Sequence, residues 1–158
     1  MAEMVRQRRE DVVAELNAEL RNLVGRSVLF QQAVAERLGL NVSDLNCLGL
    51  LAQLGPVPAG RLAEELGLTT GGTTFAVDRL EAAGFVRRER DPKDRRRVIV
   101  VPVSGVEKDT APLFDSLGAA MAELCKNYTR DELSLIAGFI RKAAPMTQRE
   151  TAKLRSHR

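Results

Sequence analysis

The fold is decided by residues 68–103, which read LTTGGTTFAVDRLEAAGFVRRERDPKDRRRVIVVPV. The first half of this stretch has the spacing of apolar residues that is typical of an α-helix. Thr69 or Thr70 can cap the start of that helix, which reaches Ala83, and Gly84 ends it. The sequence therefore predicts an amphipathic helix that is followed at once by extended chain.

The second half of the stretch predicts a β-hairpin. Phe85–Val86 begins one strand, and residues 98–103, VIVVPV, form a β-branched run suited to a second strand. Asp91–Pro92 supplies turn chemistry between the strands. Because Pro102 lacks a main-chain N–H, we expect the hairpin at the edge of its sheet.

The hairpin carries a concentrated positive charge. Between Arg87 and Arg97 the chain reads RRERDPKDRRR, in which basic residues outnumber acidic residues by seven to three. This concentration favours a phosphate-bearing partner, although a solvated hairpin tip explains the charge alone equally well. Aromatic residues make up 4% of the chain, with no tryptophan and one tyrosine, so no platform for stacking single-stranded bases is indicated. Duplex DNA is the nucleic acid that the composition favours.

The two faces of the helix before the hairpin differ in character. The face expected to pack on the core consists of Ala76, Val77, Leu80 and Ala83. The opposite face consists of Gly71, Thr74, Phe75 and Asp78. Small and hydroxyl residues near a helix N-terminus suit close approach to a phosphate backbone and a base edge. Phe75 either contacts a thymine methyl group or packs back onto the protein, and the sequence leaves both open.

The segment before this stretch is predicted to be helical. Apolar residues recur at helical spacing through the first forty residues, as one long helix or as two helices interrupted at Gly25, with Gly39 as the end. Ser43 is the expected N-cap of the next helix, which Gly55–Pro56 closes. A short helix is expected from about residue 58 to 66.

Two more helices are predicted after the hairpin. Ser104 fits a capping box, and Pro112 should bend or restart the helix that follows. Thr129 opens the last helix with a second capping box. Residues 143–145, Ala-Ala-Pro, are expected to end it.

Composition excludes several classes of function. With 158 residues, 44% hydrophobic and 28% charged, the chain has the composition of a globular domain with its own core. No secretory signal or membrane span is indicated, so a cytoplasmic location is expected. Cys47 and Cys125 lack CxxC spacing, and the single histidine is His157, which argues against a zinc cage or a Ser-His or Cys-His catalytic pair. We therefore predict no enzyme activity, cofactor or metal.

The element order and two motifs resemble the multiple antibiotic resistance regulator (MarR) family of bacterial transcription factors. The motifs are Asp78–Gly84, DRLEAAG, and Asp91–Arg96, DPKDRR, followed by a hydrophobic strand. The resemblance implies a mainly α fold with a minor β component: a winged helix-turn-helix with N- and C-terminal dimerisation helices. It also implies a homodimeric repressor that binds a palindromic double-stranded DNA operator and is released by a small ligand or an oxidant. We expect a small ligand, aromatic or amphipathic.

The chain departs from the family pattern in two places. Gly71–Gly72 and Phe75 stand where members often have Ser-Thr and a polar or basic residue. The early cysteine of peroxide-sensing members is missing, and a buried thiol is the favoured interpretation of Cys47. The alternative to DNA binding is a winged-helix module for protein contacts or assembly.

These expectations assign segments and residues. The segments are an N-terminal helical part of the dimerisation region (1–42), a DNA-binding lobe (43–103), C-terminal dimerisation helices (104–145) and a basic flexible tail (146–158). The expected recognition-helix residues are Thr69, Thr70, Gly71, Gly72, Thr74, Phe75 and Arg79. The expected wing residues are Arg90, Lys93, Asp94, Arg95 and Arg96. The apolar stripes expected to form the dimer are Leu16, Leu20, Leu23, Leu133, Ile136 and Ile140. The expected ligand pocket consists of Arg26, Phe30, Val34, Leu48, Leu51 and Leu117.

Overall fold

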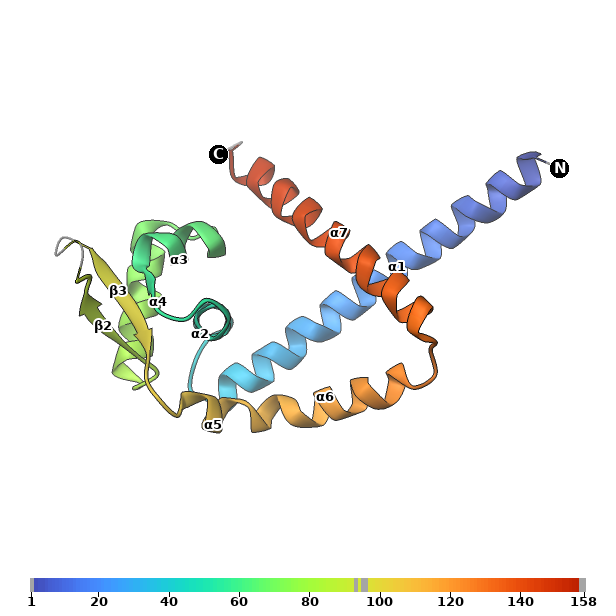
Figure 1. Cartoon of the computed structure of the whole chain (residues 1–158). Helices are drawn as coiled ribbons and strands as arrows, with labels where there is room; N and C mark the ends of the chain where they lie inside the picture. Colours follow the sequence, from blue (N-terminus) through green and yellow to red (C-terminus); the bar gives the residue numbers. More distant parts are fainter. Residues whose placement is uncertain (1, 93, 95–96, 157–158) are drawn as a thin grey trace. The chain divides into compact units, whose positions relative to one another are not determined.

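The computed structural model describes residues 2–92, 94 and 97–156, and the chain divides into two compact units (Figure 1). One unit comprises residues 1–103 and the other residues 104–158. In the first unit the helices are α1 (Ala2–Arg37), α2 (Val42–Leu54), α3 (Ala59–Leu66) and α4 (Thr70–Ala82), and the strands are β1 (Val57–Pro58), β2 (Val86–Arg90) and β3 (Val98–Pro102). In the second unit the helices are α5 (Val106–Thr110), α6 (Pro112–Cys125) and α7 (Arg130–Ser156). The predicted fold class, a mainly α winged helix-turn-helix with a small sheet, is confirmed.

The boundaries of the helices follow local chemistry. α1 passes through Gly25 without interruption, so the first helix is single. The chain turns at Gly39, whose φ of 67° is the left-handed conformation that glycine adopts without strain. The prediction of Ser43 as the N-cap of α2 is wrong. Asn41 is the cap, and its Oδ1 accepts a hydrogen bond from the main-chain N–H of Asp44 at 2.9 Å.

The core of the first unit lies among α2, α3, α4 and the sheet. Its buried apolar side chains include Leu45, Leu48, Leu51, Val57, Leu62, Ala76, Val77, Leu80, Val86 and Val100. α1 contacts α2 near the C-terminal end of α1, where Val34 and Ala35 are buried. Burying these apolar side chains contributes roughly 25 cal/mol of stabilisation for each Å² of apolar surface removed from water, and this burial holds α4 against the rest of the unit.

The sheet differs from the prediction because β1 adds a strand. The strand order is β1-β3-β2, and both pairs are antiparallel. The hairpin strand β3 is therefore central, and the prediction that the hairpin would lie at the sheet edge is wrong for this strand. Pro102 is tolerated because β1 pairs only with Ile99 and Val100, so no strand lies beside Pro102 on the β1 side. On the other side, Val103 donates its N–H to the Phe85 carbonyl at 3.0 Å.

In the second unit, a proline marks the start of α6 and a capping box marks the start of α7. The helix restarts at Pro112, as predicted, because proline suits the first turn. The capping box at Thr129 is confirmed. Glu132 Oε2 accepts from the Thr129 main-chain N–H at 2.7 Å, and the Glu132 N–H donates to Thr129 Oγ1 at 3.3 Å.

The predicted end of the last helix at residues 143–145 is wrong, because α7 continues through Pro145 to Ser156. Residues 146–156 are thus helical, where a flexible tail was predicted. Pro145 removes one main-chain hydrogen bond from α7, and two threonine hydroxyls in the turns that follow bond to carbonyl groups four residues earlier. Thr147 donates to the Ala143 carbonyl at 3.4 Å, and Thr151 donates to the Thr147 carbonyl at 2.9 Å.

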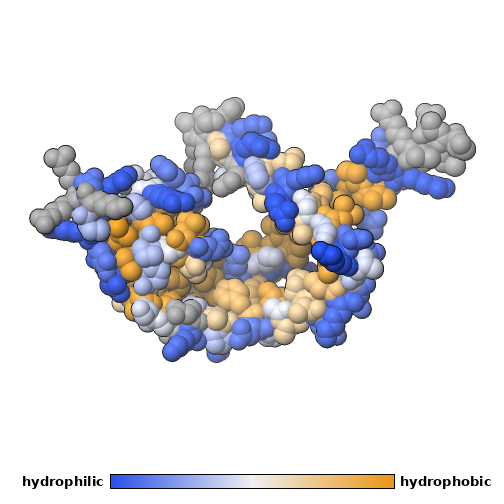
Figure 2. All heavy atoms as spheres, in the orientation of Figure 1, coloured by the Kyte–Doolittle hydropathy of each residue, from blue (hydrophilic) through white to orange (hydrophobic). Residues whose placement is uncertain are grey.

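Both units expose apolar side chains along their helices (Figure 2). On α1 the exposed residues are Val12, Val13, Leu16, Leu23, Val24, Val28 and Leu29. On α6 and α7 they include Leu117, Met121, Leu124, Leu135, Ile136, Phe139 and Ile140. In the described part of the chain, no helix combines the length and the apolar character that are needed to cross a bilayer.

Candidate nucleic-acid interface

The N-terminal turn of α4 is shaped by threonine hydroxyls. Thr69 is the N-cap, and its Oγ1 accepts a hydrogen bond from the Gly72 N–H at 3.1 Å. Thr74 Oγ1 donates to the Thr70 carbonyl at 2.9 Å. These bonds hold the first turn in helical geometry. They do so although Gly71 and Gly72 each make helix formation about 1 kcal/mol less favourable than alanine would.

The predicted division of α4 into two faces is confirmed with one exception. Ala76, Val77 and Leu80 are buried, whereas Ala83 is exposed. The fourth buried residue of α4 is Thr73, near the start of the helix. Among the residues that the structure describes, Thr73 Oγ1 has no hydrogen-bond partner. The residues predicted for the opposite face, Gly71, Thr74, Phe75 and Asp78, are all exposed.

Two features of the exposed face affect how closely a ligand can approach it. The Phe75 side chain is 66% exposed, so the alternative in which it packs back onto its own unit is excluded. A Cβ atom added at Gly71 would meet nothing within 4 Å. At Gly72, in contrast, a Cβ would lie 3.2 Å from Thr69 Oγ1, the atom that caps the helix.

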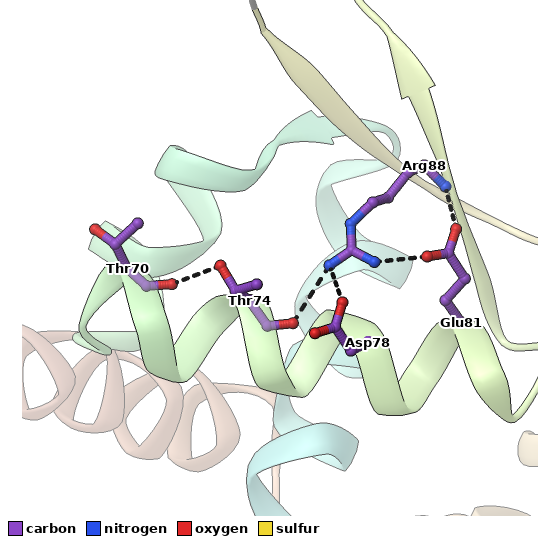
Figure 3. A network of polar contacts seen from close by, with 5 residues as sticks. All are labelled: Thr70, Thr74, Asp78, Glu81 and Arg88. Atoms are coloured by element: carbon purple, nitrogen blue, oxygen red, sulfur yellow. Dashed lines mark hydrogen bonds and ion pairs between the residues drawn. The ribbon is translucent and has the colours of Figure 1, made fainter.

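Arg88 of β2 joins the hairpin to α4 (Figure 3). Its Nη2 lies 2.6 Å from Asp78 Oδ1 and donates to the Thr74 carbonyl at 3.3 Å. Its Nη1 and its main-chain N–H donate to the two carboxylate oxygens of Glu81, at 2.6 and 2.9 Å. We call these four residues the Arg88 clamp. The clamp fixes the start of the hairpin on the exposed side of α4.

Within the Arg88 clamp, the charged forms of Glu81 and Arg88 are favoured. The main-chain N–H of Arg88, and then its guanidinium, stabilise the Glu81 carboxylate and lower its pKa. Burial alone would lower the pKa of Arg88, but its bonds to Glu81 and Asp78 outweigh burial and raise it. Because Arg88 pairs with Asp78 as well as with Glu81, it offsets part of the negative charge that Asp78 presents on the exposed face of α4.

The hairpin tip carries most of the predicted wing residues. Lys93, Arg95 and Arg96 lie outside the described residues, while Arg90 and Asp94 are exposed. The described ends of the loop are held by main-chain bonds: the Asp91 N–H donates to the Arg97 carbonyl at 3.0 Å, and the Arg97 N–H donates to the Asp94 carbonyl at 2.8 Å. On β2, Arg87 Nε donates to Glu89 Oε1 at 2.6 Å.

A groove of about 470 Å³ lies beside the start of β3. It is bounded by the β1–α3 turn and by β3, and its charged lining residues are Arg61, Glu64 and Arg97. Sequence reasoning missed this groove because it depends on the pairing of β1 with β3.

Arg79, predicted to lie near a phosphate, forms a bidentate ion pair with Asp44 of α2. Arg79 Nε and Nη2 donate to Asp44 Oδ2 and Oδ1 at 2.8 and 2.6 Å. The Asp44 side chain is 1% exposed and that of Arg79 is 48% exposed. The hydrogen bond to Asp44 raises the pKa of Arg79. The pair ties α4 to α2, and phosphate contact by Arg79 stays a prediction.

The residues predicted for a ligand pocket are divided between the units. In the first unit Val34, Leu48 and Leu51 are buried and Arg26 is exposed, while Phe30 is half-buried. Leu117 belongs to the second unit. The pocket therefore stays a prediction.

Cys47 is buried in α2, as predicted. Burial, and then the nearby Asp44 carboxylate, raise the pKa of its thiol from 9.0 to about 11. Among the described residues, no three His, Cys, Asp or Glu side chains are grouped so that they could hold a metal ion.

Comparison with known proteins identifies the family. The MarR family model matches residues 40–98, which include α2, α3, α4 and β2 and end at Val98, the first residue of β3. Over 135 residues the chain is 46% identical to the uncharacterized HTH-type transcriptional regulator YcgE of Bacillus subtilis (strain 168), a match that covers 85% of this chain and 88% of the relative. The chain belongs to the MarR family. As a MarR-family protein it is a transcriptional regulator, which bears out the prediction that it is not an enzyme.

Solved structures of MarR-family proteins share the fold. A MarR family protein from Bacillus stearothermophilus superposes with a TM-score of 0.70 at 22% identity, over 88% of this chain and 97% of that protein. Wild-type MarR from E. coli, in its apo form, superposes with a TM-score of 0.59 at 23% identity, over 80% of this chain and 94% of that protein.

Proposed function

We propose that this MarR-family regulator binds double-stranded DNA through the exposed face of α4 and the basic hairpin. The single observation that carries the proposal is the Arg88 clamp, which joins the two elements into one surface. A helix with small residues in its first turns can enter the major groove, and a basic hairpin beside it can reach the backbone or the minor groove. The hairpin residues proposed for that contact are Arg90, Lys93, Asp94, Arg95 and Arg96.

The regulator is proposed to act as a homodimer on a palindromic operator. The exposed apolar side chains of α1, α6 and α7 support the proposal, because large exposed apolar surfaces in soluble proteins mark sites of association. Leu16, Leu23, Ile136 and Ile140, predicted for the interface, are among them. A two-fold axis would place two α4 helices about 34 Å apart, one turn of DNA.

Repression that is relieved by a small aromatic or amphipathic molecule is the proposed mode of regulation. The proposed pocket is formed by Arg26, Phe30, Val34, Leu48, Leu51 and Leu117. A ligand that prefers the non-binding arrangement by about 3 kcal/mol would weaken DNA binding about a hundredfold. Titrating phenolic acids and hydrophobic drugs into the protein–operator complex tests this proposal, and release of the duplex is the expected result.

The DNA-binding proposal is tested by the salt dependence of duplex affinity. Fluorescence anisotropy with labelled duplexes from the region upstream of its own gene should give an affinity that falls steeply as salt rises. Replacing Arg95 and Arg96 by alanine should weaken binding and reduce the slope by about 2 for each chain, because each lost phosphate contact contributes about 0.9.

The matched control removes two positive charges from α7, through Arg141→Ala and Lys142→Ala, both at exposed positions. The control should bind as wild type does. Salt-independent association, or equal loss in both double variants, would instead favour a winged-helix module for protein contacts.

A further inference from the structure

Phe75 is a large apolar side chain on the proposed DNA surface, where hydrogen bonds and ion pairs cannot account for its presence. Its side chain is 66% exposed in the middle of α4, between the exposed Thr74 and the buried Ala76. The buried residues of α4 lie on the other face. The ring therefore contributes little to the core, and most of its apolar surface is accessible to a binding partner.

The neighbourhood of Phe75 keeps the ring open. Side chains of a helix lean toward its N-terminus, over the residue one turn earlier. For Phe75 that residue is Gly71, where no atom lies within 4 Å of an added Cβ. One turn later on the same face is Asp78, whose carboxylate is held by Arg88 at 2.6 Å. An approaching DNA edge thus meets an uncovered ring beside a carboxylate that is paired with an arginine.

We propose that Phe75 recognises the C5-methyl group of thymine in the major groove, an inference that rests on the proposed DNA-binding function. A phenyl ring neither donates nor accepts a strong hydrogen bond, so it can select a base only by apolar contact or by exclusion. Among the base edges exposed in the major groove, the thymine methyl is the apolar group. Phe75 is therefore a specificity-determining residue, and each half-site of the operator contains a thymine whose methyl group the ring buries.

The test removes that methyl group from the DNA and the ring from the protein. High-affinity duplexes are first selected from a random pool with the wild-type chain. Each thymine of the selected site is then replaced singly by deoxyuridine, which lacks only the C5-methyl. Affinities are measured for wild type, Phe75→Ala and Phe75→Leu, with circular dichroism as the check that each variant is folded.

The expected result is a coupling between one thymine and one side chain. Wild type should lose about fourfold in affinity at one thymine in each half-site, the factor that corresponds to burying about one methyl group. Phe75→Ala should bind the thymine and deoxyuridine duplexes equally. Phe75→Leu, which keeps an apolar side chain, should retain part of the difference. Thymines outside the selected site are the matched DNA control and should show no change.

Two other outcomes are distinguishable. If duplex is bound with a steep salt dependence but no thymine shows a methyl effect that Phe75→Ala removes, the proposed role of Phe75 is wrong and DNA binding stands. If no duplex is bound at low salt, the proposed function fails, and the role of Phe75 fails with it.

Discussion

Replacing Arg79 by alanine isolates the cost of leaving a buried carboxylate without its partner. Asp44 is 1% exposed and receives two hydrogen bonds from Arg79, at 2.8 and 2.6 Å. Removing one member of a buried ion pair typically costs about 3–5 kcal/mol. Because the Arg79 side chain is itself 48% exposed, its removal admits water to Asp44, and we expect the lower end, about 3 kcal/mol.

Thermal unfolding followed by circular dichroism, at one fixed protein concentration, measures this cost. A loss of about 3 kcal/mol lowers Tm by roughly 10 °C in a chain of this size. The matched control is Arg61→Ala, which removes an exposed i,i+4 contact to Glu65 at 3.9 Å. That contact should contribute less than about 0.5 kcal/mol.

A second variant separates the buried charge from lost packing. Adding Asp44→Asn to Arg79→Ala replaces the orphaned carboxylate by a neutral amide and should recover at least about 1 kcal/mol. The reasoning is refuted if Arg79→Ala lowers Tm no more than Arg61→Ala, or if Asp44→Asn brings no recovery.

Three further predictions follow from the described contacts. Gly71→Glu should abolish duplex binding, because it adds negative charge to the proposed DNA surface. Its Tm should stay near that of wild type, since the position is open, and a variant that unfolds would contradict this placement. Arg88→Ala should weaken duplex binding about tenfold by leaving Asp78 unneutralised, whereas Arg87→Ala, which breaks a pair with Glu89 within β2, should have a smaller effect in the same anisotropy assay. The Cys47 thiol, whose pKa is about 11, should be about one part in a thousand thiolate at pH 8 and should resist thiol reagents until the chain unfolds. Because folding favours its neutral form, the free energy of unfolding should fall as pH rises from about 9 to about 11, which urea titrations at several pH values would measure.

The features that sequence predicted correctly are those governed by local rules. The faces of α4 follow from helical spacing, because Ala76, Val77 and Leu80 recur on one side. The capping box at Thr129 is a local exchange of hydrogen bonds within four residues. The hairpin was predictable because Gly84 ends the helix before the first strand and residues 98–103 form a β-branched run that suits the second strand.

The features that sequence missed depend on contacts between distant segments. β1 has two residues, too few for any periodicity, and is a strand because Val57 pairs with Val100. Nothing in the local sequence distinguishes Arg88 from its arginine neighbours, and its role appears only when β2 lies on α4. Asp44 lies in the first turn of α2, and its pairing with Arg79 joins residues 35 positions apart.

The adjacent glycines of α4 are under different constraints, which bears on how such a regulator changes its preferred DNA sequence. A Cβ at position 72 would lie 3.2 Å from the Thr69 hydroxyl that caps the helix, so glycine at this position suits the cap. Beyond its own helical turn, a Cβ at position 71 would meet no described atom within 4 Å, so replacing this glycine is expected to avoid a clash and to stabilise the helix by up to about 1 kcal/mol. Mutations that alter function usually cost stability. At position 71, in contrast, a substitution that alters the proposed DNA surface is expected to keep or raise the stability of α4.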